Sequence, residues 1–184
     1  MMVELRPAPD WQIAHWLNVP SPLAQLRGKV VLAVAFQMLC PGCVIHSLPQ
    51  AIRARDAFPE NDLAVIGLHT VFEHHEAQGT RAALAAFLHE YRIYFPVGID
   101  AQDPGGAGPQ TMHAYGMQGT PTTLLIDRRG YLRLHKFGHL DDMGLGAAIA
   151  PLIGEILTPR RAGEAEEKAG CDDEGCRIAE QAHA

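Results

Sequence analysis

The chain has 184 residues, of which 47% are hydrophobic and 20% charged, so it holds enough apolar material for one ordinary globular core. That composition excludes a disordered, a collagen-like or a disulfide-scaffold chain. The net charge is −6, and neither half of the chain is basic, which argues against a nucleic-acid-binding protein. The excess negative charge is uneven, because residues 160–184 alone hold 4 basic and 7 acidic side chains.

The predicted elements alternate between buried strands and amphipathic helices. In chain order they are a short helix flanked by Trp11 and Trp16, a turn at 23–26, a strand at 30–36, a helix at 41–57, a strand at 63–68, a helix at 80–91, a strand at 95–99, a helix at 110–115, strands at 122–127 and 131–137, and a helix at 141–157.

Local signals support these bounds. Residues 30–36 form a continuous apolar run, which is typical of a central strand buried on both faces. Pro49 should kink its helix, Thr80 is a candidate N-cap, and Gly130 marks a tight hairpin turn. The order predicts an α/β fold in which helices cover both faces of a mixed sheet, with a C-terminal hairpin and helix.

We expect one domain over residues 1–159 and an acidic, mobile tail over 160–184. The first 16 residues lack the apolar stretch of a signal peptide, and the apolar run at 30–36 is far below the roughly 20 residues of a membrane span. The chain is therefore expected to be soluble and cytoplasmic, with no membrane or nucleic-acid partner. In a reducing compartment, paired cysteines are more often catalytic or metal-binding than structural.

Cys40-Pro41-Gly42-Cys43 is the pattern that carries chemistry. It follows a buried strand and opens a helix, where free backbone N–H groups and the helix dipole favour an anion. A thiolate is the form that attacks disulfides, so Cys40 is the expected nucleophile and Cys43 the resolving thiol. The competing interpretation is half of a zinc site, which would need two more ligands.

These residues resemble the thioredoxin-like redoxins of the AhpC/TSA and TlpA branches over roughly residues 12–157. The resemblance rests on the Leu26–Leu32 lead-in, the Cys-Pro-Gly-Cys motif and Gly119-Thr120-Pro121-Thr122. It implies a thioredoxin-like fold, a cis Pro121 facing the active cysteines, and a Thr120 backbone that helps to hold the substrate. It also implies a redox-active disulfide that needs no organic cofactor and no metal.

The chain departs from the family at several positions. Leu39 stands where thioredoxins have Trp, and residues 30–36 carry no buried acid. His46 takes the place of a carboxylate found in TlpA-type relatives, and Pro49 lies one residue further from Cys43 than the usual kink proline. His46 is therefore a candidate for proton transfer with Cys43, and the alternative is a solvated helix residue.

A peroxiredoxin-like thiol peroxidase, with a role in defence against oxidants, is the second hypothesis. Peroxiredoxins place Pro and Thr or Ser before their reactive cysteine, and here Ala33 and Gln37 stand at those positions. Gln37 still offers a hydrogen-bond donor for a peroxide. Neither Arg128 nor Arg129 can be matched to the arginine that stabilises the peroxidatic thiolate.

Two further groups carry alternatives. His69, His74 and His75 suggest either a wall beside Cys40 or a metal site, against a polar loop with histidines by chance. In the tail, Cys171 and Cys176 suggest an auxiliary redox pair or a metal site, against an unstructured segment.

We conclude from the sequence that the chain is a thiol–disulfide oxidoreductase. Its expected partners are a disulfide-containing protein, or a small thiol or peroxide substrate, together with a thiol reductant. A non-catalytic thioredoxin-fold module that binds a metal or a partner protein is the alternative from a different class.

Overall fold

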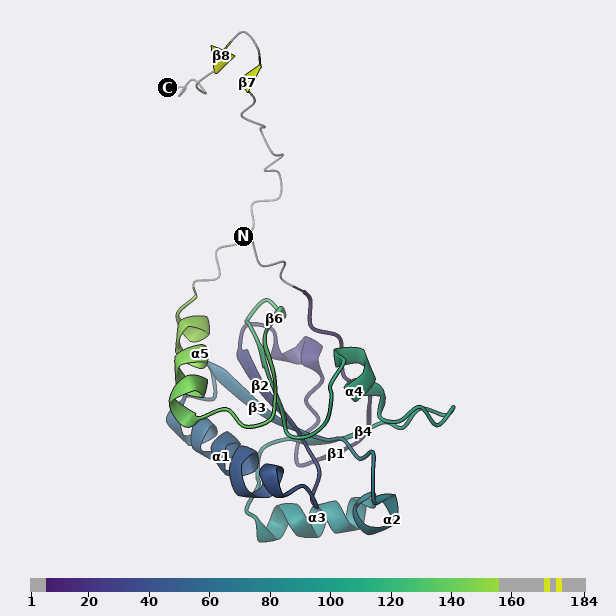
Figure 1. Cartoon of the computed structure of the whole chain (residues 1–184). Coiled ribbons are helices and arrows are strands. Elements are labelled where there is room, and N and C mark those ends of the chain that lie inside the picture. The colour runs from purple at the N-terminus through teal and green to yellow at the C-terminus, as the bar shows by residue number, and fades with distance from the viewer. Residues whose placement is uncertain (1–5, 156–170, 173–174, 177–184) are drawn as a thin grey trace.

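In the computed structural model, which describes residues 6–155, 171–172 and 175–176, a mixed sheet forms the centre of the fold (Figure 1). The strand order is β1-β4-β3-β2-β5-β6. The strands are β1 (Ile13–Leu17), β2 (Val30–Phe36), β3 (Leu63–His69), β4 (Val97–Asp100), β5 (Thr122–Ile126) and β6 (Leu132–Phe137). β2, β3 and β4 are parallel, and β1, β5 and β6 pair antiparallel with their neighbours. The predicted mixed sheet is confirmed.

β2 is the central strand because its side chains are apolar on both faces. All seven of its residues are buried. Val30, Leu32, Val34 and Phe36 pack into one core cluster, whereas Val31, Ala33 and Ala35 pack into the other. Both faces of the sheet must therefore be covered, as predicted from the continuous apolar run.

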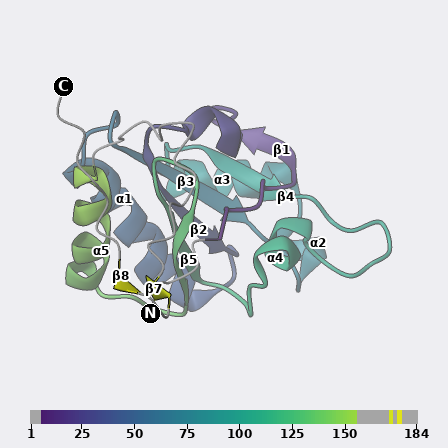
Figure 2. The same ribbon diagram turned by 90° about the horizontal axis from the view of Figure 1, so that it is seen from above.

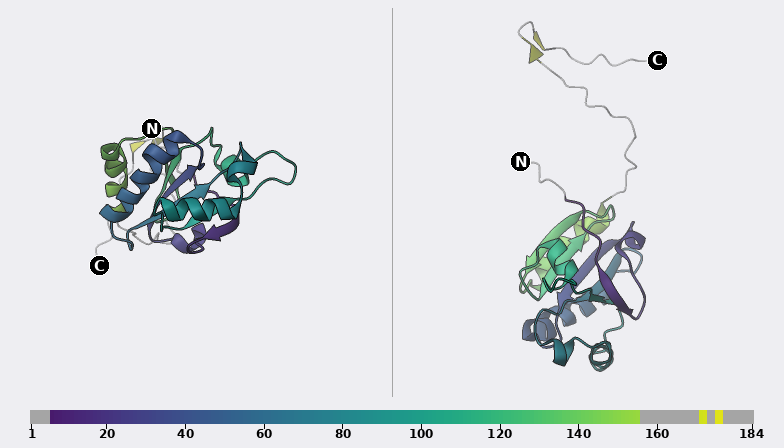
Figure 3. Two further views of the ribbon diagram at one scale, coloured as in Figure 1. Left: turned by 90° about the horizontal axis from the view of Figure 1, so that it is seen from below. Right: turned by 90° about the vertical axis from the view of Figure 1, so that its right-hand side faces the viewer.

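The helices supply those two covers (Figures 2 and 3). Leucines and isoleucines of α1 (Leu48–Ala57), α3 (Arg81–Glu90) and α5 (Asp142–Gly154) belong to the first core cluster. The 3₁₀ turn η1 (Leu23–Leu26) and α4 (Gln110–Tyr115) contribute Leu23 and Tyr115 to the second. Thr80 caps α3 as predicted, since its hydroxyl accepts a hydrogen bond from the Ala83 N–H at 3.1 Å. None of the described helices is long and apolar enough to cross a bilayer.

Two predictions about local structure are wrong. Residues 13–17 form strand β1 instead of a helix, because they pair with β4 and Ile13 lies across the bare backbone of Gly98. A Cβ at Gly98 would lie 2.7 Å from the Ile13 side chain, so this close approach depends on glycine. The segment 69–79 is also more ordered than a loop, since it contains the short helix α2 (His75–Gln78).

The helix after the cysteines starts with a wide turn. Residues Cys43–Ser47 form the π-helical segment η2, in which the Leu48 N–H bonds to the Cys43 carbonyl five residues earlier. Pro49 follows within the first turn of α1. A proline ring clashes with the carbonyl four residues before it and has no N–H to donate there. The wider π turn removes that clash, so the irregularity predicted at Pro49 takes this form.

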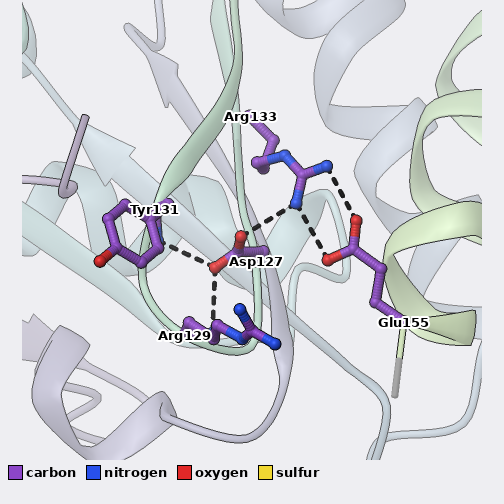
Figure 4. Close-up of polar contacts among 5 residues, drawn as sticks. All are labelled: Asp127, Arg129, Tyr131, Arg133 and Glu155. Carbon is purple, nitrogen blue, oxygen red and sulfur yellow. Dashed lines mark hydrogen bonds and ion pairs between the residues drawn. The ribbon is translucent and has the colours of Figure 1, made fainter. Parts of the chain in front are cut away.

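The β5–β6 turn lies at the end of the sheet away from the cysteines. Polar contacts around Asp127 hold this turn (Figure 4). Asp127 is buried and accepts hydrogen bonds from the N–H groups of Arg129 and Tyr131, both at 2.9 Å. Arg133 bridges Asp127 at 3.0 Å to Glu155 after α5 at 2.8 Å. This network fixes the hairpin to the end of α5.

Most of the acidic tail lies outside the described residues, so its predicted mobility and the boundary at 159 stay predictions. The described part consists of two short strands, β7 (Cys171–Asp172) and β8 (Gly175–Cys176). They pair antiparallel, with Cys171 opposite Cys176.

His69 ends β3 inside the core. Its side chain is 1% exposed, its ring lies 5.3 Å from that of Phe36, and neither ring nitrogen has a hydrogen-bond partner within the part of the chain that the structure describes. Burial lowers the pKa of His69 from 6.5 to about 4, because a charged imidazolium would lose its hydration there.

This burial predicts a loss of stability in mild acid. The unfolded chain protonates His69 below about pH 6.5, whereas the folded protein does so only near pH 4. Above pH 6.5, protonation of His69 does not affect the free energy of unfolding. As the pH falls from 6.5 to 4, that free energy decreases by about 3 kcal/mol. Urea unfolding at a series of pH values should show this loss in the wild type and in His75→Gln, an exposed control, but not in His69→Leu. Equal losses in wild type and His69→Leu would contradict the assignment.

Candidate active site

Cys40 lies just beyond the carboxyl end of β2, where the chain turns into a helix. The Cys40 carbonyl accepts hydrogen bonds from the N–H groups of Cys43 at 3.0 Å and Val44 at 3.1 Å, so the helix begins here. Pro41 occupies the first helical turn, where its missing N–H costs nothing. Cys40 is partly exposed and Cys43 is fully buried. The motif therefore has the placement that the sequence predicted.

The Cys40 sulfur lies between a donor and an acceptor. The Cys43 N–H donates to Cys40 Sγ at 3.3 Å, and the thiol in turn contacts the Thr120 carbonyl at 3.5 Å. A backbone donor aimed at sulfur favours the thiolate, while the carbonyl accepts from the protonated thiol. One accessible sulfur thus has a backbone donor and a backbone acceptor within reach.

The two thiols are unequal. The pKa of Cys43 is raised from 9.0 to about 12, mainly by burial and also by its hydrogen bond with Cys40, against smaller lowering effects from the Gln37 backbone and Thr120. Cys43 therefore stays protonated near neutral pH and reacts only when the neighbouring sulfur or a base activates it. This asymmetry fits an exposed attacking thiol and a protected resolving thiol.

Thr120 and Pro121 face the motif as the resemblance implied. The Thr120–Pro121 peptide bond is cis. A Cβ at Gly42 would lie 3.4 Å from Pro121 Cδ, so the proline ring packs over the loop between the cysteines. The Pro121 carbonyl accepts a hydrogen bond from the Gly138 N–H at 2.8 Å, which ties this loop to the end of β6.

His46 is placed differently from the cysteines. It is exposed on η2, and its ring lies 4.8 Å from the ring of His139. Among the described residues, no hydrogen bond joins His46 to either thiol. Its role in proton transfer stays a prediction.

Of the residues considered for a peroxidase, Gln37 lies next to Cys40 but has its polar groups engaged, and Arg128 lies at the far end of β2. The Gln37 side chain is 1% exposed, and both its oxygen and its nitrogen are already hydrogen-bonded within the protein. Arg128 donates to the Gly28 carbonyl at 2.6 Å and to Asp62 at 2.7 Å, at the start of β2. The seven residues of β2 separate that end from Cys40 by about 20 Å.

The three histidines also fail to form one site. His69 is in the core, whereas His74 and His75 are exposed at α2. Over the described residues, no group of three His, Cys, Asp or Glu side chains is arranged to hold a metal ion. The metal hypothesis for this cluster is not supported.

Sequence reasoning did not identify the residues that hydrogen-bond to the turn before Cys40. Gln78 from α2 accepts a hydrogen bond from the Leu39 N–H at 3.0 Å, and Glu73 accepts one from Gln37 at 3.4 Å. Nothing in the local sequence distinguishes these residues from solvated loop side chains. Only the packing of α2 against the turn before Cys40 brings them together.

A Cys-x-x-Cys motif at a helix start, faced by a cis-proline loop on a mixed sheet, defines the thioredoxin-like class of proteins. The AhpC/TSA family description matches residues 5–135, and the chain belongs to that family.

The chain is similar in sequence and structure to known proteins of this class. Protein DipZ of Mycobacterium tuberculosis is 34% identical over 140 residues, which cover 73% of this chain and 19% of DipZ. The chain thus spans only a small part of that relative's length. Among solved structures, a thioredoxin-like superfamily protein, SPOA0173, is 58% identical with a TM-score of 0.78, over 82% of this chain and 98% of that one. A thiol-disulfide isomerase from Corynebacterium glutamicum is 41% identical with a TM-score of 0.79, over 84% and 100%.

The unequal thiols predict selective alkylation. With the reduced protein near neutral pH, iodoacetamide should modify Cys40 and leave Cys43 unmodified, because Cys43 is buried and its pKa lies at about 12. Peptide mass spectrometry measures both sites. Unfolding in urea before alkylation should remove the difference, and equal labelling in the folded protein would contradict the assigned roles.

Proposed function

We propose that this chain is a thiol–disulfide oxidoreductase in which Cys40 attacks and Cys43 resolves. The observation that carries the proposal is the partly exposed Cys40 sulfur, held at 3.3 Å from the Cys43 N–H and at 3.5 Å from the Thr120 carbonyl. The buried Cys43 lies one helical turn further on. Such a pair exchanges electrons with a disulfide without a cofactor.

The reaction has two displacement steps. The Cys40 thiolate attacks one sulfur of a substrate disulfide, that S–S bond breaks, and the leaving thiolate takes up a proton. Cys43 then loses its proton and attacks Cys40 Sγ, which releases the second substrate thiol and closes a Cys40–Cys43 disulfide. Two electrons have passed to the substrate. An external thiol reductant then supplies two electrons to the Cys40–Cys43 disulfide and regenerates both thiols. The same steps run in reverse oxidise a substrate dithiol.

Thr120 and Pro121 support docking of the substrate in this scheme. The Thr120 carbonyl already lies beside the attacking sulfur, and the Pro121 ring covers the loop between the cysteines. A polypeptide laid along this loop brings its disulfide to Cys40. We therefore propose disulfide-containing proteins as substrates, in line with the similar thiol-disulfide isomerase from Corynebacterium glutamicum. A cytoplasmic location stays a prediction.

Exchange is favoured over peroxide reduction because Gln37, the residue in place of the peroxidase hydroxyl, is buried and engaged. It is favoured over metal binding because the two thiols have no third ligand among the described residues.

Reduction of insulin by the protein with dithiothreitol tests the proposal. We expect Cys40→Ser to lose activity by about 10³-fold or more, since the nucleophile is gone. Cys43→Ser keeps the first step and should accumulate a stable mixed disulfide on Cys40, detected by mass spectrometry. Equal rates for wild type and Cys40→Ser would refute exchange, and peroxide consumption that depends on Cys40 would then assign the peroxidase activity.

We also propose that Cys171 and Cys176 form an auxiliary redox pair. The pairing of β7 with β8 sets these residues directly opposite each other. Opposed residues of antiparallel strands have Cα atoms about 4.5–5.5 Å apart, within the range of about 4.4–6.8 Å that a disulfide requires. The backbone register therefore permits a bond between them.

An auxiliary pair predicts a measurable change in electron supply. In Cys171→Ser/Cys176→Ser, the steady-state rate at low reductant concentration should fall about threefold or more, because a tethered thiol acts at a high effective concentration. Single-turnover attack by pre-reduced Cys40 should stay unchanged. Identical steady-state rates, or failure of the oxidised wild type to hold two disulfides, would contradict the role.

A further inference from the structure

Gln37 is a buried amide whose hydrogen-bonding groups are all occupied. Its Oε1 accepts from the Phe72 N–H at 3.2 Å and from Gln78 Nε2 at 3.1 Å. Its Nε2 donates to Glu73 Oε1 and to Thr120 Oγ1, each at 3.4 Å. A glutamine amide has two donors and two acceptor lone pairs, so no capacity is left for a ligand.

Gln78 extends this network to the residue before the nucleophile. Its side chain is fully buried, its Oε1 accepts from the Leu39 N–H at 3.0 Å, and its Nε2 donates to the Glu73 carbonyl at 2.9 Å as well as to Gln37. The two amides thus join the turn before Cys40 to the segment from Phe72 to Gln78.

Gln37 reaches Cys40 by two routes. Its backbone carbonyl accepts from the Cys40 N–H at 3.3 Å, and its side chain holds the Thr120 hydroxyl. Thr120 in turn presents its carbonyl to Cys40 Sγ at 3.5 Å. One residue therefore connects the nucleophile's turn with the loop opposite it, and a fully satisfied buried network of this kind specifies a single arrangement.

We infer that Gln37 and Gln78 are positioning residues, which fix the distance and angle between the Cys40 sulfur and the cis-proline loop. The pair touches neither sulfur through its side chains and takes no part in bond making. It acts by holding Cys40 over the Cys43 N–H and by holding Thr120 in reach. This inference deepens the proposed function and rests on it only for the activity measurement.

The first test changes one contact with little change in shape. Thr120→Val removes the acceptor for Gln37 Nε2, while Thr120→Ser retains it. We expect Thr120→Val and Gln37→Leu each to lower kcat/KM for insulin reduction about tenfold, and Thr120→Ser to restore most of it. Because both substitutions break the same link, the double variant should lose little more than either single variant.

The second readout does not depend on catalysis. The rate constant of Cys40 alkylation by iodoacetamide at a fixed pH should fall about threefold or more in Gln37→Leu and in Gln78→Leu, because a loosened turn no longer keeps the sulfur over the Cys43 N–H. Gln50→Leu is the matched control. It removes another buried glutamine, whose partners are the Leu140 carbonyl and Asp142, and it should change neither the alkylation rate nor the activity.

The outcomes separate the two proposals. A wild-type alkylation rate in Gln37→Leu and Gln78→Leu, with wild-type kcat/KM in Thr120→Val, would overturn the positioning role even if the protein reduces insulin. Slower alkylation in these two variants, together with a wild-type protein that reduces no disulfide, would instead refute the proposed function and keep the positioning role. Should Gln37→Leu fail to fold, the Thr120 pair of variants and Gln78→Leu still decide the question.

Discussion

The site depends on a single backbone contact, the Cys43 N–H that points at Cys40 Sγ. This donor exists because the chain enters a helix at Cys40, and the helix starts there because β2 ends at Phe36 with its direction fixed by neighbours on both sides. The apolar run of β2, buried on both faces, is therefore the ultimate reason that a thiol lies at a helix start.

The two cysteine side chains are chemically identical, and their different burial gives them different roles. Cys40 remains partly open, whereas Cys43 packs into the core cluster beneath α1 and keeps its proton. Thioredoxins proper carry a buried acid on the strand before the cysteines, but here β2 offers only apolar side chains, with Val34 opposite Gly67 on β3. The polar groups near the thiols come instead from α2 and from the cis-proline loop.

Elements that depend on local pattern were predictable from the sequence, and those that depend on pairing were not. The bounds of β2, the cap of α3 and the Cys-Pro-Gly-Cys placement follow from short-range signals. β1 was predicted as a helix, because its edge pairing with β4 depends on contacts some 80 residues away in sequence. The Gln37–Gln78 contact likewise joins segments far apart in sequence, so no local signal could reveal it.

The π turn of η2 explains why Pro49 is set one residue further from Cys43 than the usual kink proline. A π turn holds one residue more than a regular α-helical turn. In a regular helix, an inserted residue would instead rotate all the following positions about the helix axis. The extra residue is thus absorbed within Cys43–Ser47, and the buried face of α1 keeps its orientation towards the sheet. An ungapped alignment anchored at the cysteines would therefore misplace the positions of α1 that follow the wide turn, from Pro49 onwards.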